Sequence, residues 1–252
     1  MIFIREEWEI ERIRTSALLA WEVLSSLKLL MVPGTTTKDI DQEAARLIRE
    51  RGGKPTFLGY RGFPANICIS IDDEVVHGVP GGRRLEEGQL VSVDLGVTYD
   101  GYVGDVAKTF LVGEVPPEKV RLAKETERAL WEGIAQAVEG NRVGDISSAI
   151  QRYVEVRGYS VVRELTGHGV GRELHEDPQV PNFGKPRTGP RLWEGMVLAI
   201  EPMVAMGSPD VVTDSDGWTV RTRDSLPSAH FEHMVVVRRG RPEVLSLPES
   251  YG

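Results

Sequence analysis

The sequence of 252 residues contains a single cysteine, Cys68, so no intramolecular disulfide can form. A chain without disulfides fits a reducing compartment such as the cytoplasm. A lone cysteine also leaves no CxxC pair, which structural zinc sites commonly use. These absences exclude a disulfide-stapled scaffold and a cysteine-based zinc module.

Long apolar runs are absent as well. No stretch approaches the ~20 apolar residues of a membrane span, and the N-terminus, M-I-F-I-R-E-E-W-E, has acidic residues where a signal peptide needs an apolar run. Basic residues are outnumbered, with 30 Lys and Arg against 38 Asp and Glu. The resulting net charge of −8 argues against a broad nucleic-acid surface. We therefore expect a cytoplasmic protein with no membrane contact and no nucleic-acid readout.

What is present predicts one α+β domain over residues 1–252, because the length suits a single large unit. Apolar residues at three-and-four spacing, with Pro and Gly at the ends, predict helices. Alternating apolar runs predict strands. We expect helices over residues 4–31, 36–52, 116–140 and 143–157, and strands over 67–72, 91–112, 161–162, 196–202 and 229–237. The second half repeats the order of the first, although no residue-level repeat proves duplication.

The segment Val91–Asp105, V-S-V-D-L-G-V-T-Y-D-G-Y-V-G-D, predicts a β-hairpin around Asp100-Gly101. A two-residue loop pairs Gly96 with Asp105, so Asp94 and Asp105 lie on one face as diagonal neighbours. Carboxylates buried that close together need a cation between them. On the hairpin alone, a solvated acidic face explains the pattern equally well.

Three further residues are unusual in their context. Glu201 and Glu232 occur in strand-like runs that otherwise read as core, and His168 is flanked by glycines in G-H-G-V-G-R. The glycines are expected to let the backbone approach a ligand closely. Each glutamate alone could pair with an arginine. Together with Asp94 and Asp105, however, the two glutamates make four carboxylates beside one histidine, and this set favours a centre of two divalent ions. Oxygen ligands with one imidazole suit Mn, Fe(II), Co or Zn.

Taken together, Asp-x10-Asp, G-H-G-V-G-R-x-x-H, I-E-P-M and F-E-H resemble the methionine aminopeptidases of the pita-bread fold (M24 metallopeptidases), in the compact type 1 form. The resemblance runs from Ile10 to about Val237. It implies two pseudo-symmetric halves with helices outside a curved antiparallel sheet. It also implies removal of the N-terminal methionine from nascent proteins and peptides, with a small second residue preferred.

The resemblance assigns roles to the metal ligands. Asp105 and Glu232 bridge two ions, Asp94 completes one ion, and His168 and Glu201 complete the other. A metal-bound hydroxide then attacks the first peptide bond while Glu201 relays a proton. We expect a monomer, and a transient ribosome contact is left open.

The resemblance also places substrate-binding residues. His77 and His175 face the substrate, His175 steadying the scissile carbonyl and the developing oxyanion. The apolar residues implied to line the methionine pocket are Phe57, Tyr60, Phe63, Cys68, Leu174 and Trp218. The sequence departs from the common bacterial pattern at Phe57 (often Cys), Arg61 (often His), Leu174 (usually aromatic) and Gly96 (usually a hydroxyl residue that helps orient the metal-bound water). These departures bear on substrate tolerance and turnover.

Two other functions remain alternatives. A related peptidase could cleave before proline, although those relatives usually carry an extra N-terminal domain. A pita-bread protein could also have lost catalysis and only bind partners, although all five ligand positions are filled here. Incubation with a methionine peptide and with an Xaa-Pro peptide distinguishes the three functions, because each predicts cleavage of the first peptide, of the second, or of neither.

Overall fold

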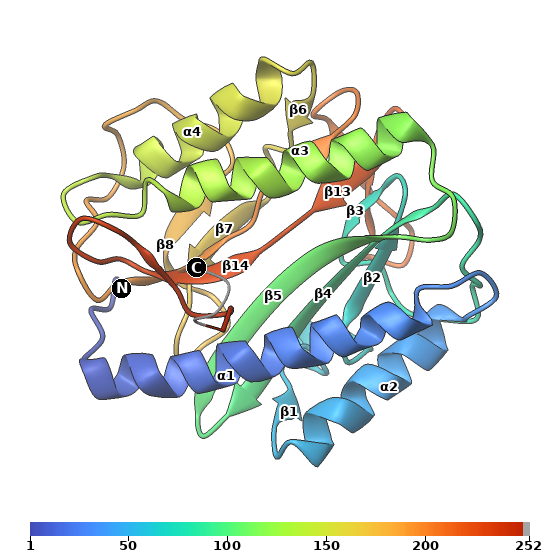
Figure 1. Cartoon of the computed structure of the whole chain (residues 1–252), viewed down its shortest axis with the longest axis horizontal. Helices are drawn as coiled ribbons and strands as arrows, with labels where there is room; N and C mark the ends of the chain where they lie inside the picture. Colours follow the sequence, from blue (N-terminus) through green and yellow to red (C-terminus); the bar gives the residue numbers. More distant parts are fainter. Residues whose placement is uncertain (249–252) are drawn as a thin grey trace.

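The computed structural model describes residues 1–248, in which two pairs of helices flank a set of antiparallel strands (Figure 1). The pair α1 and α2 lies on one side of the strands and the pair α3 and α4 on the other (Figure 1). The helices are α1 (Glu7–Ser26), α2 (Thr37–Glu50), α3 (Pro117–Ile134) and α4 (Val143–Glu155), with the short 3-10 segments η1 (Leu27–Leu30) and η2 (Tyr60–Gly62). Each half of the chain thus supplies one helix pair, as the resemblance implied.

The strands form four antiparallel sheets, and the order within each is given by its hydrogen-bonded neighbours. One sheet runs β1–β4–β2 with β5 paired to β4, and the largest runs β15–β14–β9–β7–β8; the others are β13–β10–β6 and β11–β12–β3. The strands are β1 (Lys54–Pro55), β2 (Cys68–Ile71), β3 (Glu74–Val76), β4 (Leu90–Tyr99), β5 (Tyr102–Leu111), β6 (Ser160–Val161), β7 (Thr166–Gly169), β8 (Glu176–Pro181), β9 (Val197–Ile200), β10 (Met203–Ala205), β11 (Val211–Thr213), β12 (Val220–Thr222), β13 (Ser228–His230), β14 (His233–Val236) and β15 (Glu243–Val244). The α+β class is confirmed.

The acidic hairpin has the predicted register. In the β4–β5 pair Gly96 lies opposite Asp105 and Asp94 opposite Ala107. The loop residues Asp100 and Gly101 both have positive φ, 48° and 77°, as the tight primed turns of hairpins require. The alternation of side chains therefore carries both aspartates to one face of the hairpin.

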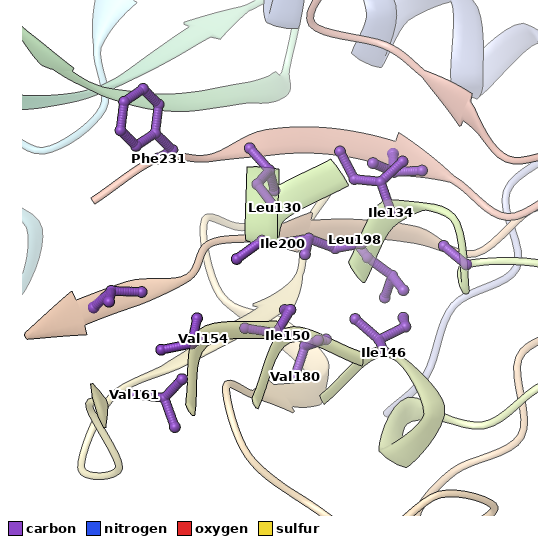
Figure 2. Packing of buried hydrophobic residues seen from close by; sticks show 14 of the residues in the cluster. Leu130, Ile134, Ile146, Ile150, Val154, Val161, Val180, Leu198, Ile200 and Phe231 are labelled. Carbon is purple, nitrogen blue, oxygen red and sulfur yellow. The ribbon is translucent and has the colours of Figure 1, made fainter. Parts of the chain in front are cut away.

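Buried apolar residues join each helix pair to the sheets. Under α3 and α4 they form a continuous cluster with strand β9, which Figure 2 shows around Leu130, Ile150 and Leu198. A similar cluster packs α1 and α2 on the outer face of β4, where Val91, Val93 and Leu95 are fully buried. Full burial of such a side chain contributes ~1.5–3 kcal/mol. The opposite face of β4 is left free to carry polar groups.

Several expected boundaries were wrong at the points where the chain changes sheets. The strand expected over residues 196–202 ends at Ile200, so Glu201 lies just beyond β9. The strand expected over 229–237 is interrupted at Phe231–Glu232, because β13 pairs with β10 whereas β14 pairs with β9. At this interruption the Glu232 backbone N–H donates to the carbonyl of Ala107 on β5, at 2.9 Å. This bond joins the sheets of the two halves.

The helices also differ slightly at their ends. Helix α1 begins at Glu7 rather than residue 4, behind a capping box of Glu6 and Glu9, and its last turn tightens into η1. Helix α3 ends at Ile134, short of the expected Gly140, whereas the expected Thr36–Asp39 capping of α2 is confirmed. Among residues 1–248, no helix is long and apolar enough to cross a membrane.

Candidate metal centre and substrate cavity

One cavity of about 600 Å³ collects every residue that the sequence and its resemblance marked for the site. The residues are Phe57, Tyr60, Phe63, Cys68, His77, Asp94, Asp105, His168, Leu174, His175, Glu201, Trp218 and Glu232. Among the other residues of its lining are Arg61 and Arg163. Residues from both halves of the chain thus meet at one place, while their individual roles stay predictions.

The polar floor of the cavity forms where the two large sheets meet. The hairpin sheet contributes Asp94 from β4 and Asp105 from β5. The other sheet contributes His168 from β7 and the two glutamates that follow β9 and precede β14, Glu201 and Glu232. The bond between Glu232 and Ala107 fixes the two sheets together beside these side chains. Four of the five donors therefore come from paired backbone, and the fifth, Glu201, directly follows β9.

The histidine of this floor is oriented by the backbone. Its Nδ1 lies 2.9 Å from the Gly169 carbonyl oxygen, and because a carbonyl can only accept, Nδ1 carries the proton. The Nε2 atom of His168 is then left with a free lone pair, at 3.3 Å from Glu201 Oε1 and 3.7 Å from Asp105 Oδ2. A backbone bond that fixes the tautomer in this way is typical of metal-binding histidine.

The carboxylates of the floor are buried without enough hydrogen-bond donors. Among the described residues, Asp94 Oδ1, Asp105 Oδ1 and Glu232 Oε1 are buried oxygens with no hydrogen-bond partner. An uncompensated buried carboxylate is costly. The donor set therefore fits divalent cations, and one set of mutually close ligand atoms comes from Asp105, His168 and Glu232.

Burial has a strong effect on the protonation of these groups in the protein alone. It raises the pKa of Asp94 and that of Glu201 to about 7. Burial and the neighbouring carboxylates raise the pKa of Asp105 and that of Glu232 well above the usual range. A bound cation would reverse these shifts, because it favours the ionised form of each ligand.

Two other histidines stand at the cavity away from the acidic floor. His77 follows β3 with φ of 59°, a conformation that non-glycine residues rarely adopt, and burial lowers its pKa to about 4. His175 is exposed at the mouth, where its Nδ1 lies 2.7 Å from the Tyr60 hydroxyl. Its ring also packs on His168, with centroids 4.3 Å apart. Both residues line the cavity.

Aromatic side chains make the apolar wall of the cavity. Phe63 and Trp218 meet edge to face with centroids 5.2 Å apart. Phe57 lies against Gly96, where an added Cβ would be 2.7 Å from the ring. The two departures from the common pattern therefore belong together, because the Phe57 ring takes the space of a side chain at position 96.

The glycines around His168 serve a different purpose from the one expected. A Cβ on Gly167 would lie 2.4 Å from the Ala199 carbonyl oxygen, and one on Gly169 would lie 2.2 Å from that of Asp177. Both therefore permit close packing of neighbouring protein backbone. The expectation that they admit a ligand was wrong, because strands β8 and β9 occupy both sides of β7.

Sequence reasoning missed one residue beside the floor, His230. Its imidazole is 1% exposed, and its Nε2 lies 3.4 Å from Glu201 Oε2. In A-H-F-E-H position 230 lies two residues before Glu232, the spacing of one face of a strand, and this spacing is the sequence signal that pointed to His230. Glu232 was the more evident candidate in this segment, because a carboxylate in a core strand is rarer than a histidine.

Comparison with known proteins decides the family. The sequence matches metallopeptidase family M24 over residues 11–239. The chain belongs to the M24 metallopeptidases. A methionine aminopeptidase of Clostridium acetobutylicum is 48% identical over 99% of this chain and 100% of its own length.

Solved structures agree with the M24 assignment. A methionine aminopeptidase of Thermotoga maritima superposes with a TM-score of 0.97 at 41% identity, covering 98% of this chain and 100% of its own. A prolidase of Pyrococcus furiosus, 23% identical, covers 98% of this chain but 66% of its own, with a TM-score of 0.80. This second likeness concerns the fold alone. The pita-bread architecture expected of an M24 chain is confirmed.

Proposed function

We propose that this M24 metallopeptidase removes the N-terminal methionine from nascent polypeptides and peptides, preferring a small second residue. The observation that carries the proposal is the junction of an acidic floor, with buried unpartnered oxygens, and an aromatic wall within one cavity. The matching names of full-length relatives support it. We take residues 1–252 as one catalytic domain, of which 249–252 lie outside the described residues.

The acidic floor would hold two divalent ions among Mn, Fe(II), Co and Zn, with Asp94, Asp105, His168, Glu201 and Glu232 as ligands. When bound, the ions would supply Lewis-acid polarisation of the substrate carbonyl and lower the pKa of water. Glu201 is the proposed proton carrier between the attacking water and the leaving amine, which is the role that the family resemblance gives it.

The two remaining histidines would orient the peptide. With the Tyr60 hydroxyl donating to Nδ1 of His175, the proton of that ring sits on Nε2, where it can donate to the scissile carbonyl as charge develops. His77 is kept neutral by its low pKa and can likewise donate or accept without carrying charge. The methionine side chain fits the wall of Phe57, Phe63 and Trp218, since a flexible thioether packs well on aromatic rings.

Peptide cleavage by metal-stripped protein tests the proposal. Met-Ala-Ser, an Xaa-Pro dipeptide and an Xaa-Pro-led peptide are each incubated with and without added Mn²⁺ or Co²⁺. Metal-dependent release of methionine is expected from Met-Ala-Ser alone, and Glu201→Gln should lose it. Cleavage only before proline would move the chain to the sister activity, and no cleavage with metal bound would point to a binding protein. Monomeric state, cytoplasmic location and ribosome contact stay predictions.

A further inference from the structure

The indole of Trp218, which forms part of the aromatic wall, is carried by a turn at the end of a hairpin arm. The arm consists of the paired strands β11 and β12, and the turn between them spans residues 214–219. The turn is bonded mainly to itself. The carboxylate of Asp216 accepts from the backbone N–H groups of Trp218 and Thr219, at 2.8 and 2.9 Å. These bonds shape the turn, but they do not place it against the cavity.

The side chain of Arg221 on β12 ties this turn to β3. Its Nε donates to Asp214 Oδ2 on the turn, at 2.6 Å. Its Nη1 donates to Asp73 Oδ1, just before β3, at 2.9 Å, and its Nη2 donates to Glu74 Oε1 on β3, at 2.7 Å. A planar guanidinium can make all three bonds at once, because its donors form a fixed fork. Within residues 1–248, no other side chain hydrogen-bonds to both the turn and this end of β3.

The strand register is adapted to this clamp. The register of β12 on β3 shifts after the pair Val220–Val76. The next pair is Arg221 with Glu74, so Val75 is skipped. Bulges are common beside functional sites, where they re-aim a side chain. Here the shift brings a cation directly opposite an anion instead of opposite a buried valine, and opposite charges form a favourable cross-strand pair.

The β3 side of the clamp is anchored independently of Arg221. Glu74 also accepts from the backbone N–H of Ile71 at 2.7 Å and from Nη1 of Arg83 at 2.8 Å. The turn has no comparable second anchor among the described residues. Removal of the Arg221 guanidinium would therefore free the turn rather than β3.

The position of the turn decides where the Trp218 ring lies. This ring meets Phe63 edge to face in the cavity wall, and aromatic contacts of this kind depend on geometry. We infer that Arg221 is a positioning residue, which fixes the Trp218 ring for the methionine side chain by clamping the turn to β3. The inference rests on the proposed function, because it treats the ring as a wall of the methionine pocket. Arg221 itself does not line the cavity, so its loss should weaken methionine binding and spare the chemical step.

Two variants open the clamp from different sides. Arg221→Gln removes the central cation, and Asp214→Asn weakens the clamp only at the turn, so the second variant tests the inference even if the first fails to fold. In both, KM for Met-Ala-Ser should rise about two- to tenfold, the worth of one aromatic contact, while kcat stays within about twofold. ¹⁹F NMR of protein labelled with fluorotryptophan reports the ring directly. The Trp218 signal, identified by its loss in Trp218→Phe, should shift or broaden in both variants.

A matched control is Arg223, which is exposed on the same segment and donates to the Val211 carbonyl at 3.4 Å. Arg223→Gln should leave KM and the Trp218 signal unchanged. If the Arg221 and Asp214 variants lose thermal stability but keep KM and the Trp218 signal, the clamp is structural only and the inference is overturned. No cleavage of Met-Ala-Ser by the wild-type protein would overturn the proposed function, whereas the Trp218 signal needs no substrate and tests the clamp by itself.

Discussion

Loading the metal-free protein with Mn²⁺ should release protons, and the affinity for the ion should rise steeply with pH. The reason is that the four acidic ligands hold protons when no cation is present. Burial raises the pKa of Asp94 and of Glu201 to about 7, and burial with the neighbouring carboxylates raises the pKa of Asp105 and of Glu232 well above the usual range. Metal ligands must be deprotonated, so binding expels these protons.

The number of protons follows from these values. At pH 7 a group with a pKa of about 7 is half protonated, so Asp94 and Glu201 together release about one proton. The raised pKa values of Asp105 and Glu232 add to this release. Each released proton is worth about tenfold in affinity per pH unit, or ~1.36 kcal/mol. A release of about one proton or more thus raises the affinity at least about tenfold between pH 6 and pH 7.

Isothermal titration calorimetry in two buffers of different ionisation enthalpy counts the protons directly. Glu201→Gln serves as the comparison, since it should release about half a proton less at pH 7. A titration with no proton release, and an affinity flat between pH 6 and pH 7, would refute the argument that buried carboxylates are protonated in the metal-free centre.

Thermal stability should report the same linkage. A carboxyl group whose folded pKa lies above its unfolded value stabilises the fold fully below the unfolded pKa, and this contribution is lost as pH rises through the folded pKa. For Asp94 and Glu201 the window runs from about 4 to about 7. Because metal removes the shift, the Tm difference between loaded and metal-free protein should widen across this window. A constant difference would contradict the reasoning.

Three further variants test the cavity. Tyr60→Phe removes the hydrogen bond to His175, which is worth ~1 kcal/mol. The kcat on Met-Ala-Ser should therefore fall about fivefold with KM nearly unchanged. An unchanged kcat would contradict the proposal that His175 donates to the scissile carbonyl. Gly96→Ala places a Cβ 2.7 Å from the Phe57 ring and 2.9 Å from Thr56 Cβ, and it should cost about 1–3 kcal/mol in denaturant unfolding. Phe57→Cys should relieve only the part of this loss that comes from the ring, and equal losses in both backgrounds would disprove the clash with Phe57. Burial raises the pKa of the Cys68 thiol, so the folded protein should resist iodoacetamide at pH 8, and modification before unfolding would show that the cavity wall opens.

Local patterns in the sequence determined a large part of this protein. The Asp100-Gly101 turn fixed the register of the hairpin, because only a few loop types join two strands through two residues. That register by itself places Asp94 and Asp105 on one face, since side chains alternate along each strand. Capping residues and apolar periodicity likewise predicted the four helices, and the motifs around His168, Glu201 and Glu232 predicted the M24 family.

Tertiary structure alone decided the relations between distant segments. The strand break at Phe231–Glu232 arises because the chain crosses from one sheet to another, and the periodicity of that segment holds no trace of the crossing. The contact of Phe57 with Gly96 and the position of His230 behind Glu201 also join residues far apart in the chain. Sequence patterns report the free energy of local conformation and burial. Which side chains face one another across two sheets depends on packing between strands that no local pattern encodes.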